Sequence, residues 1–322
     1  KITFSSGDIL NVGASVASSG TSTQKVADIE SGSSNRDKIK VTTTGTVSNV
    51  GAAVASSSVA EQDFGVIDSQ SSTQNAIEVT KSGSITNVSA GLAGKADSLQ
   101  EVASIKGGTS ATGSKITFSS GDILNVGASV ASQGNSDQTI AVIESGDSNQ
   151  DQIKLKIGSA INASGGLAAN ITASQNIGVI KSSKKSSKDQ IDLSVSEGIS
   201  NIAGGLLGKT TAEQNVGVIN SKTSSSTKVR VYAKKIENVG VSVLGSAKSV
   251  QKIGEVSSTA LSDNVDVKVR INEDITGTAV GATGSSSVVQ EIGVVQGNNS
   301  KNIELDINAE AIRGTGIGIL SG

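Results

Sequence analysis

Residues 1–18 read KITFSSGDILNVGASVAS, and the same eighteen residues recur without change at 115–132. The match between the two copies stays close as far as Lys40 and Lys154, and the shift is 114 residues, or three times 38. A duplication of this length and regularity indicates a chain built from repeats, in which each unit contacts mainly its neighbours.

Two amide side chains mark the repeat. Glutamines recur at steps of 37 to 39 residues, at Gln24, Gln62, Gln100, Gln138, Gln175, Gln214, Gln251 and Gln290. An asparagine stands thirteen residues before each of the first seven, at Asn11, Asn49, Asn87, Asn125, Asn162, Asn201 and Asn238. In the eighth unit the same place is taken by Gly277, where we expect a weak point or a kink.

The segments between these marks have the pattern of β-strands. Units open with apolar residues at every second position, as in Ile39-x-Val41, and we align the openings Val229-x-Val231 and Val265-x-Val267. Period-two alternation is typical of a strand with one buried face. The residue three after each glutamine is Gly or Ala, and the residue five after it is Ile or Val. Helix is the local competitor, but no segment has a sustained helical stripe.

Equal spacing of amides favours a stack in which like positions lie above one another. A carboxamide carries both a donor and an acceptor, so a column of amides can bond along a stack with strands about 4.8 Å apart. An unpaired buried amide is costly, so such columns would also fix the register. The alternative is that these residues mark exposed turns.

The sequence therefore predicts an all-β fold, a β-solenoid of eight repeats of about 38 residues plus a C-terminal half repeat. We expect one domain over 1–322, with one composite layer per unit in preference to two short coils. A β-propeller is the rival fold, although four aromatic residues in the chain are few for packing between blades. The expected units are 1–38, 39–76, 77–114, 115–152, 153–190, 191–228, 229–264 and 265–302, with a half unit at 303–322.

The composition argues against most kinds of chemistry. The chain has no His, Cys, Met, Trp or Pro and a formal net charge of −2. Without His or Cys there is no imidazole base, thiolate or usual metal ligand set, so we expect no enzyme, cofactor or metal site. No basic patch with aromatics predicts nucleic-acid binding, and no apolar run predicts membrane insertion. We expect a mature, secreted protein at the cell surface or outside the cell.

The ends of the repeat array predict self-association. The first unit matches the fourth, and the half unit ends in the small apolar stretch Ile317–Leu320, so neither end resembles a polar cap. Open strand edges are templates for another chain, so we expect end-to-end stacking, with the half unit as a donated strand.

Repeats with regularly placed Asn and Gln, rich in Gly, Ala and Ser, resemble the bacterial functional-amyloid fibre subunits, the curlin and Fap-type biofilm fibrils. The resemblance is carried by segments such as Asn49-Val50-Gly51-Ala52-Ala53 and Gln175-Asn176-Ile177-Gly178-Val179-Ile180. The resemblance is to the class of protein and not to either family's motif: curlin repeats are shorter, and their Gln–Asn–Gln order is absent from this chain. It implies secretion, a cross-β core and a role in biofilm matrix or surface attachment.

The leading hypothesis is thus a structural subunit of a self-assembling extracellular fibre, with the chain itself as partner. The alternative is an adhesin stalk or passenger that presents a binding domain without polymerising, and a solenoid lyase is third. Weak contact of the loop Lys181–Lys188 with acidic polysaccharide is a minor alternative.

Overall fold

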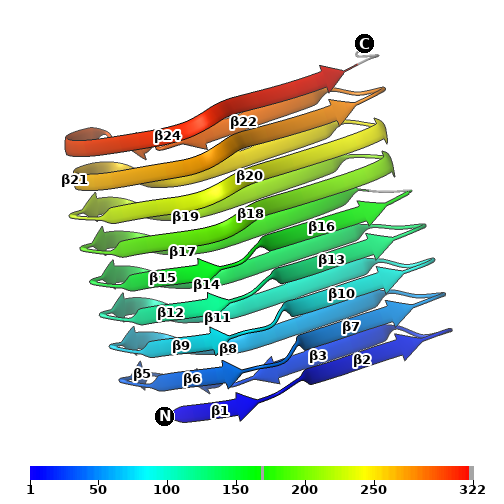
Figure 1. The fold of residues 1–322 in the computed structure, drawn as a ribbon, viewed down its shortest axis with the longest axis horizontal. Helices are drawn as coiled ribbons and strands as arrows, with labels where there is room; N and C mark the ends of the chain where they lie inside the picture. Colours follow the sequence, from blue (N-terminus) through cyan, green and yellow to red (C-terminus); the bar gives the residue numbers. More distant parts are fainter. Residues whose placement is uncertain (168–169, 319–322) are drawn as a thin grey trace.

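The computed structural model describes residues 1–167 and 170–318, which form strands stacked in layers (Figure 1). In each layer an outgoing segment crosses the stack, turns at a tip, and a return segment runs back beside it. The chain then steps to the next layer at the opposite side. The first and last layers lie at opposite ends of the stack. We number the layers 1 to 9 from the N-terminal end.

Outgoing segments are usually two strands separated by a bend, and they fuse into single strands from layer 6 onward. They are β1 (Ile2–Ser6), β2 (Ile9–Ser15), β6 (Lys38–Thr43), β7 (Val47–Ala53), β9 (Ala76–Lys81), β10 (Ile85–Gly91), β12 (Lys115–Ser120), β13 (Ile123–Ser129), β15 (Gln152–Ile157), β16 (Ala160–Gly166), β18 (Gln190–Leu207) and β20 (Lys228–Leu244).

Return segments are mostly single long strands. They are β3 (Gly20–Val26), β4 (Ile29–Ser31), β5 (Ser34–Asn35), β8 (Ser58–Thr73), β11 (Ala96–Thr112), β14 (Gly134–Asn149), β17 (Ile171–Ser187), β19 (Thr210–Ser225), β22 (Ser286–Ile292) and β23 (Val295–Gln296). Two strands combine both kinds of segment. β21 (Ala247–Gly281) is the return segment of layer 7 and the outgoing segment of layer 8. β24 (Asn299–Gly318) ends the return segment of layer 8 and forms the outgoing half of layer 9.

Each strand pairs in parallel with the equivalent strand one repeat away. Asn49 lies opposite Asn87, and Gln100 lies opposite Gln138. This pairing is that of a β-solenoid of about eight turns, as the repeat predicted, with one composite layer per unit. It is not that of a propeller, whose blades do not stack in parallel register.

One expected alignment is wrong by two residues. Val229 pairs with Val267 and not with Val265, so the boundary between units 229–264 and 265–302 falls two residues later. Val265, Val267 and Val269 are all buried in the alternating row. Because side chains repeat every two residues along a strand, a shift of two keeps the same face, and alternation alone could not fix this register.

Every layer bends at two places where the backbone adopts a left-handed conformation. The first is the small residue three after each glutamine, as at Ala103 (φ 54°) and Gly178 (φ 59°). This position is buried, as Ala103 is fully, and a Cβ on Gly178 would already meet the side chain of Leu193, so only Gly and Ala are small enough to recur there. The second is the corner between layers, where Arg36, Gln74 and Lys188 have φ values of 51° to 56°.

The bend within the outgoing segment and the left-handed residue three after each glutamine divide each layer into a core arm and a tip arm. The core arm, as in β6 with Phe64–Thr73, encloses rows of Ile, Val, Leu and Phe, including the fully buried Ile67 and Ile105. The tip arm, as in β7 with Ser58–Gln62, is thinner. A Cβ on Gly127 would overlap the backbone of Asn135, so the two segments nearly touch and leave space only for small or flat side chains.

Candidate functional site

The interior of the tip arm holds a continuous column of glutamines. The structure brings all eight together in the order of the chain, and each side-chain amide donates to the glutamine of the preceding layer. The seven Nε2–Oε1 bonds measure 2.7 to 3.0 Å and join Gln62 to Gln24, Gln100 to Gln62, Gln138 to Gln100, Gln175 to Gln138, Gln214 to Gln175, Gln251 to Gln214 and Gln290 to Gln251.

A second column, of asparagines, runs beside the first. The six Nδ2–Oδ1 bonds measure 2.9 to 3.1 Å and join Asn11 to Asn49, Asn49 to Asn87, Asn87 to Asn125, Asn125 to Asn162, Asn162 to Asn201 and Asn201 to Asn238. These amides also join the two segments of the arm: Asn87 Nδ2 lies 2.8 Å from the backbone oxygen of Leu99 on the return segment. From Asn49 to Asn238 the side chains have no exposed surface.

Gly277 ends the asparagine column without interrupting the backbone. Asn238 pairs with Gly277, and Gly277 pairs with Gly314, in unbroken register, so the kink considered for this site is not found. The amide of Gln290 lies against the position where a side chain of residue 277 would begin. Asn238 Nδ2 is instead satisfied by Ser249 Oγ at 3.0 Å and by Val250 O at 2.7 Å.

A third polar column, which the sequence interpretation missed, lies at the corner between layers. The backbone N–H of Asp151 donates to Asp189 Oδ1 at 2.9 Å, and that of Ser114 donates to Asp151 Oδ1 at 2.7 Å. Ser148 and Ser186 donate to the second oxygens of the two carboxyls. The recurring Ser-x-x-Asp or Ser-x-x-Asn at 34, 72, 148 and 186 was the available signal.

Asp151 and Asp189 are fully buried and stand in adjacent layers. Burial disfavours the ionised carboxylate and raises the pKa of Asp151 to about 7. The neighbouring carboxyl of Asp189 acts in the same direction, and the bonds from Ser148 and Ser114 oppose it. Burial likewise raises the pKa of Asp189. This pair makes the corner sensitive to pH near neutrality.

Among the described residues, layer 1 is paired on one side only, through β1 with β6 and β2 with β7. Layer 1 has the same sequence as layer 4 over 1–18, yet Phe118 is 1% exposed and Ile116 is fully buried, while their counterparts Phe4 and Ile2 are only partly buried. Ser6 O accepts a hydrogen bond from Thr44 N, so the backbone groups of Ser6 face layer 2. Backbone groups of successive strand residues point to alternate sides, so those of Thr3 and Ser5 face the open side.

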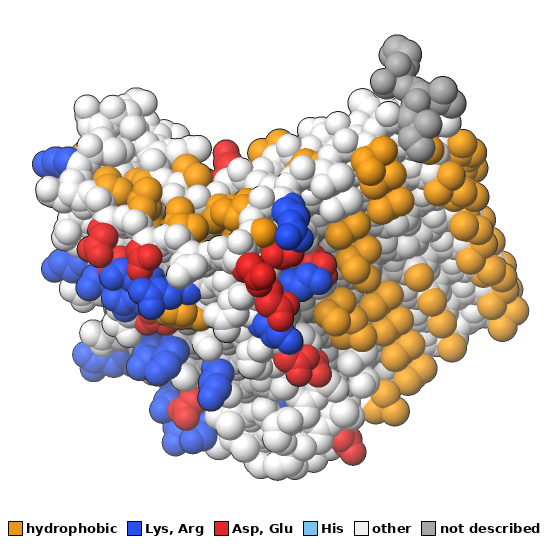
Figure 2. Space-filling model, turned by 45° about the horizontal axis from the view of Figure 1, so that its top comes forward, with side chains coloured by type: hydrophobic (Ala, Val, Ile, Leu, Met, Phe, Trp, Pro, Cys, Tyr) orange, Lys and Arg blue, Asp and Glu red, His pale blue; other side chains and the backbone are white. Residues whose placement is uncertain are grey.

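The outer surface of the tip arm was also missed. On the outgoing segments, the positions that alternate with the inward asparagines carry Val, Ala and Leu side chains that point outward. Leu92 and Leu167, just past the ends of β10 and β16, are 52% and 49% exposed. These side chains form parallel rows at the right of Figure 2, while charged side chains gather at the centre and left of that view. On the outgoing face of this arm the usual pattern is thus inverted, with asparagines inside and aliphatic side chains outside, although Ile171 and Ala173 are buried within the arm.

Within the described part of the chain, no cluster of three or more His, Cys, Asp or Glu side chains has a geometry for holding a metal ion. None of its segments is a helix with the length and apolar character required to cross a membrane. Comparison with family models, curated proteins and solved structures gives no match.

Proposed function

We propose that this protein is a structural subunit of a β-rich fibre that assembles by end-to-end stacking of its layers. The observation that carries the proposal is that the outgoing segment of layer 1 is identical in sequence to that of layer 4. An interior layer buries Ile116, Phe118 and Ile123 between two neighbours, and layer 1 presents the same residues with one neighbour. A further layer on the open side would complete that burial and pair the free backbone groups of β1 and β2.

The opposite edge offers a matching strand. The outgoing half of β24, from Ile303 to Gly318, covers layer 8 in register, and its far side is open among the described residues. If it pairs with β1 and β2 of the next copy, nine outgoing segments fill one axial repeat of about 43 Å, at about 4.8 Å per layer. The described part of the chain has nine outgoing segments but only eight return segments, so the junction leaves one return position unfilled next to β22. A donated strand from a neighbouring copy would fill it.

An extracellular site of action agrees with the chemistry of the chain. A fibre held by amide columns and aliphatic rows, with no Cys, would not depend on the redox state of its surroundings. The class resemblance to curlin and Fap-type fibrils supports the same placement, in biofilm matrix or surface attachment. The segment Lys181–Lys188, expected to be a loop, lies almost entirely in β17, and its exposed lysines would face the outside of the fibre, where acidic polysaccharide is a candidate contact.

The test is electron microscopy and fibre diffraction of the purified chain over a range of concentrations. We expect unbranched filaments with a meridional reflection near 4.8 Å and an axial repeat of about 43 Å. A chain that stays monomeric at high concentration would instead favour the adhesin stalk, which uses the same stack without self-contact.

A matched pair of variants separates assembly from folding. Thr3→Pro removes a backbone N–H that faces the open side of layer 1 and should prevent or shorten filaments while the fold persists. Thr117→Pro makes the same change at the identical place in layer 4, where the N–H belongs to the internal pairing, and should destabilise the fold. Unchanged filament growth by the Thr3→Pro variant would contradict the proposed junction.

A further inference from the structure

The outward side chains of the tip arm form ridges and a trough along the stack. One ridge is Val12, Val50, Val88, Val126, Ala163, Ile202 and Val239, and a second, nearer the tips, is Val16, Val54, Leu92, Val130, Leu167, Leu206 and Val243. Between them lies a row of small residues, Ala14, Ala52, Ala90, Ala128, Gly165 and Gly204, closed by Val241 in layer 7.

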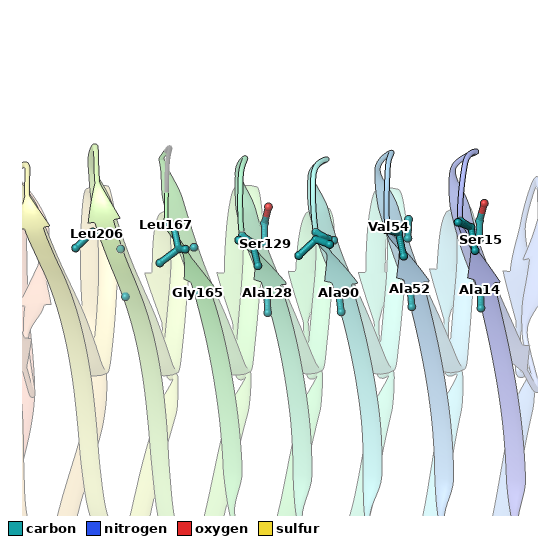
Figure 3. A pocket seen from close by; sticks show the side chains of 18 of the residues that line it. Ala14, Ser15, Ala52, Val54, Ala90, Ala128, Ser129, Gly165, Leu167 and Leu206 are labelled. Carbon is teal, nitrogen blue, oxygen red and sulfur yellow. The ribbon is translucent and has the colours of Figure 1, made fainter.

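The trough is a real depression of the surface. Its volume is about 980 Å³, and it is lined by the Ala and Gly row and the ridge near the tips, with the first ridge beside it, outside the lining; Figure 3 shows the small row repeating from layer to layer beneath the Val and Leu side chains. Residues four apart on a strand are separated by about 13 Å, so the distance between ridges leaves room for one additional row of side chains.

The face carries no charge over its first six layers. In the outward row next to the first ridge, these layers have Leu10, Ser48, Thr86, Leu124, Ile161 and Ser200, and the first charged residue is Glu237 in layer 7. The outer surface of the core arm differs, since Lys38, Lys40 and Glu78 lie on it and form ion pairs. A partner on the tip-arm face therefore desolvates aliphatic groups without burying an ion.

We propose that this face binds the same face of a second copy, so that two solenoids pair side by side. Each copy would place its Val and Leu ridge near the tips in the trough of the other, as sheets pack about 10 Å apart with interdigitated side chains. The repeat of about 4.8 Å is the same in both partners, so ridge and trough match along the whole length.

The area is sufficient for a stable pair. Seven layers at about 4.8 Å and the four outward positions over about 20 Å of strand give roughly 680 Å² per copy. Two copies would bury about 1,350 Å², which lies within the range of about 1,200–2,000 Å² for specific interfaces. A single acyl chain in the trough would leave both ridges exposed, which favours a second sheet as occupant. The pairing does not depend on axial stacking.

The experiment compares Leu92→Lys with Leu99→Lys, both in the Thr3→Pro background that suppresses axial growth. Both leucines belong to the tip arm of layer 3 and are exposed, but Leu92 lies on the ridge and Leu99 on the return segment. Sedimentation velocity at tens of micromolar should give a dimer of two 32.0 kDa chains for the background and for Leu99→Lys, and a monomer for Leu92→Lys. Leu92→Met, which keeps the volume, should remain dimeric.

Fibres of the unblocked chain give a second reading. One solenoid of 32.0 kDa per axial repeat of about 43 Å has about 7 kDa per nm, and a lateral pair has about 15 kDa per nm. Mass-per-length measurement should show the larger value, reduced to the smaller one by Leu92→Lys while filaments still grow. A monomeric background protein, single-solenoid filaments, or equal behaviour of Leu92→Lys and Leu99→Lys would overturn the pairing. Binding to phosphatidylcholine vesicles by a monomer would assign the face to lipid instead.

Discussion

The side-chain amide of Gln62 donates to Gln24 Oε1 at 2.8 Å, and so directs its hydrogen bond toward the N-terminal end of the stack. The neighbouring asparagine column runs the other way, since Asn11 donates to Asn49 Oδ1. The two columns therefore have opposed dipoles within one thin arm, which limits the net dipole along the stack. Each column also gives the stack a direction, because reversing one amide would place two donors or two acceptors face to face.

An interior glutamine should matter more than a terminal one. Gln138→Leu removes the donor to Gln100 Oε1 and the acceptor for Gln175 Nε2, and both stranded groups are buried. At about 1–3 kcal/mol for each unsatisfied group, we expect a loss of about 2–6 kcal/mol in the free energy of unfolding.

Gln24→Leu is the matched control for this prediction, because it strands only the amide of Gln62. Its cost should be about 1–2 kcal/mol. Urea denaturation followed by circular dichroism measures both variants. Equal losses at the two sites would show that the cost comes from the leucine side chain itself and not from the broken column.

The buried corner should lose stability as the pH rises through neutrality. The pKa of Asp151 is about 7 in the folded protein and near 3.8 when exposed, so the folded state binds more protons between these values. The stabilising contribution of the protonated carboxyl is thus complete below about pH 4 and is lost through about pH 7. Three pKa units correspond to about 4 kcal/mol, shared with Asp189 in this coupled pair.

Asp151→Asn should reduce that pH dependence, leaving the part due to Asp189, and should stabilise the protein at pH 8. Asn75 occupies the equivalent corner in layer 2 and donates to Ser72 Oγ at 2.6 Å, so an amide is accommodated there. The measurement is urea denaturation at pH 5 and pH 8, with the exposed Asp68→Asn as control. A wild-type protein that is equally stable at both values would exclude a titrating carboxyl at this corner.

The periodic features were accessible from the sequence because the fold repeats them. The spacing of Gln100 and Gln138 predicted the stacking direction, since only a repeated environment retains a buried amide at a fixed interval. The register near Val265 was not accessible, because a shift of two residues leaves every side chain on the same face. At the corner, the left-handed residues Arg36, Gln74 and Lys188 share no side-chain chemistry, so the signal lay in the neighbouring Ser-x-x-Asp or Ser-x-x-Asn pattern, which was overlooked.

The apolar surface was implied by the sequence but was not drawn from it. Alternation places Val50 and Asn49 on opposite sides of the strand, so a buried asparagine column requires an outward valine. The physical reason is the close approach of the two backbones in the tip arm, which leaves room mainly for flat amides and small residues; Ile171 is buried there only where Gly166 and Gly205 leave space. That distance is a tertiary property, so a single strand gives no sign of it.

Glycine at the bend should be required in some layers and replaceable in others. A Cβ on Gly65 would make ordinary contacts with Ile77 and Val79, whereas a Cβ on Gly178 would overlap the side chain of Leu193. Gly65→Ala should therefore cost about 1 kcal/mol, the penalty of a left-handed alanine. Gly178→Ala should cost about 1–3 kcal/mol more, since the overpacked Leu193 must move.

Thermal unfolding of the two alanine variants tests this difference, and Ala103→Gly provides the reverse change. Ala103 has a φ of 54°, so glycine should relieve strain there and leave stability unchanged or higher by up to about 1 kcal/mol. A similar loss for Gly65→Ala and Gly178→Ala would mean that the backbone alone, and not the packing of Leu193, decides the choice of residue.

Extending the asparagine column by one layer should stabilise the C-terminal part of the stack. Gly277 pairs with Asn238, so an asparagine there would bring an Oδ1 to the amide that now ends the column. The new bond should contribute about 1 kcal/mol. Replacing a strand glycine adds about 0.5–1 kcal/mol by restricting the unfolded chain. The nearest atoms to the new side chain would be Cγ1 of Val288, at 3.0 Å from its Cβ, and the amide of Gln290 at 3.1 Å, so both side chains must shift slightly to admit it.

Gly277→Ala separates the two contributions, because alanine restricts the unfolded chain without supplying an acceptor. Amide hydrogen exchange of β21 and β22 should slow more in Gly277→Asn than in Gly277→Ala, since both strands border the extended column. If the two variants protect these strands equally, the gain belongs to the backbone. The glycine would then end the column because Gln290 needs its space, and an eighth asparagine could not join the stack.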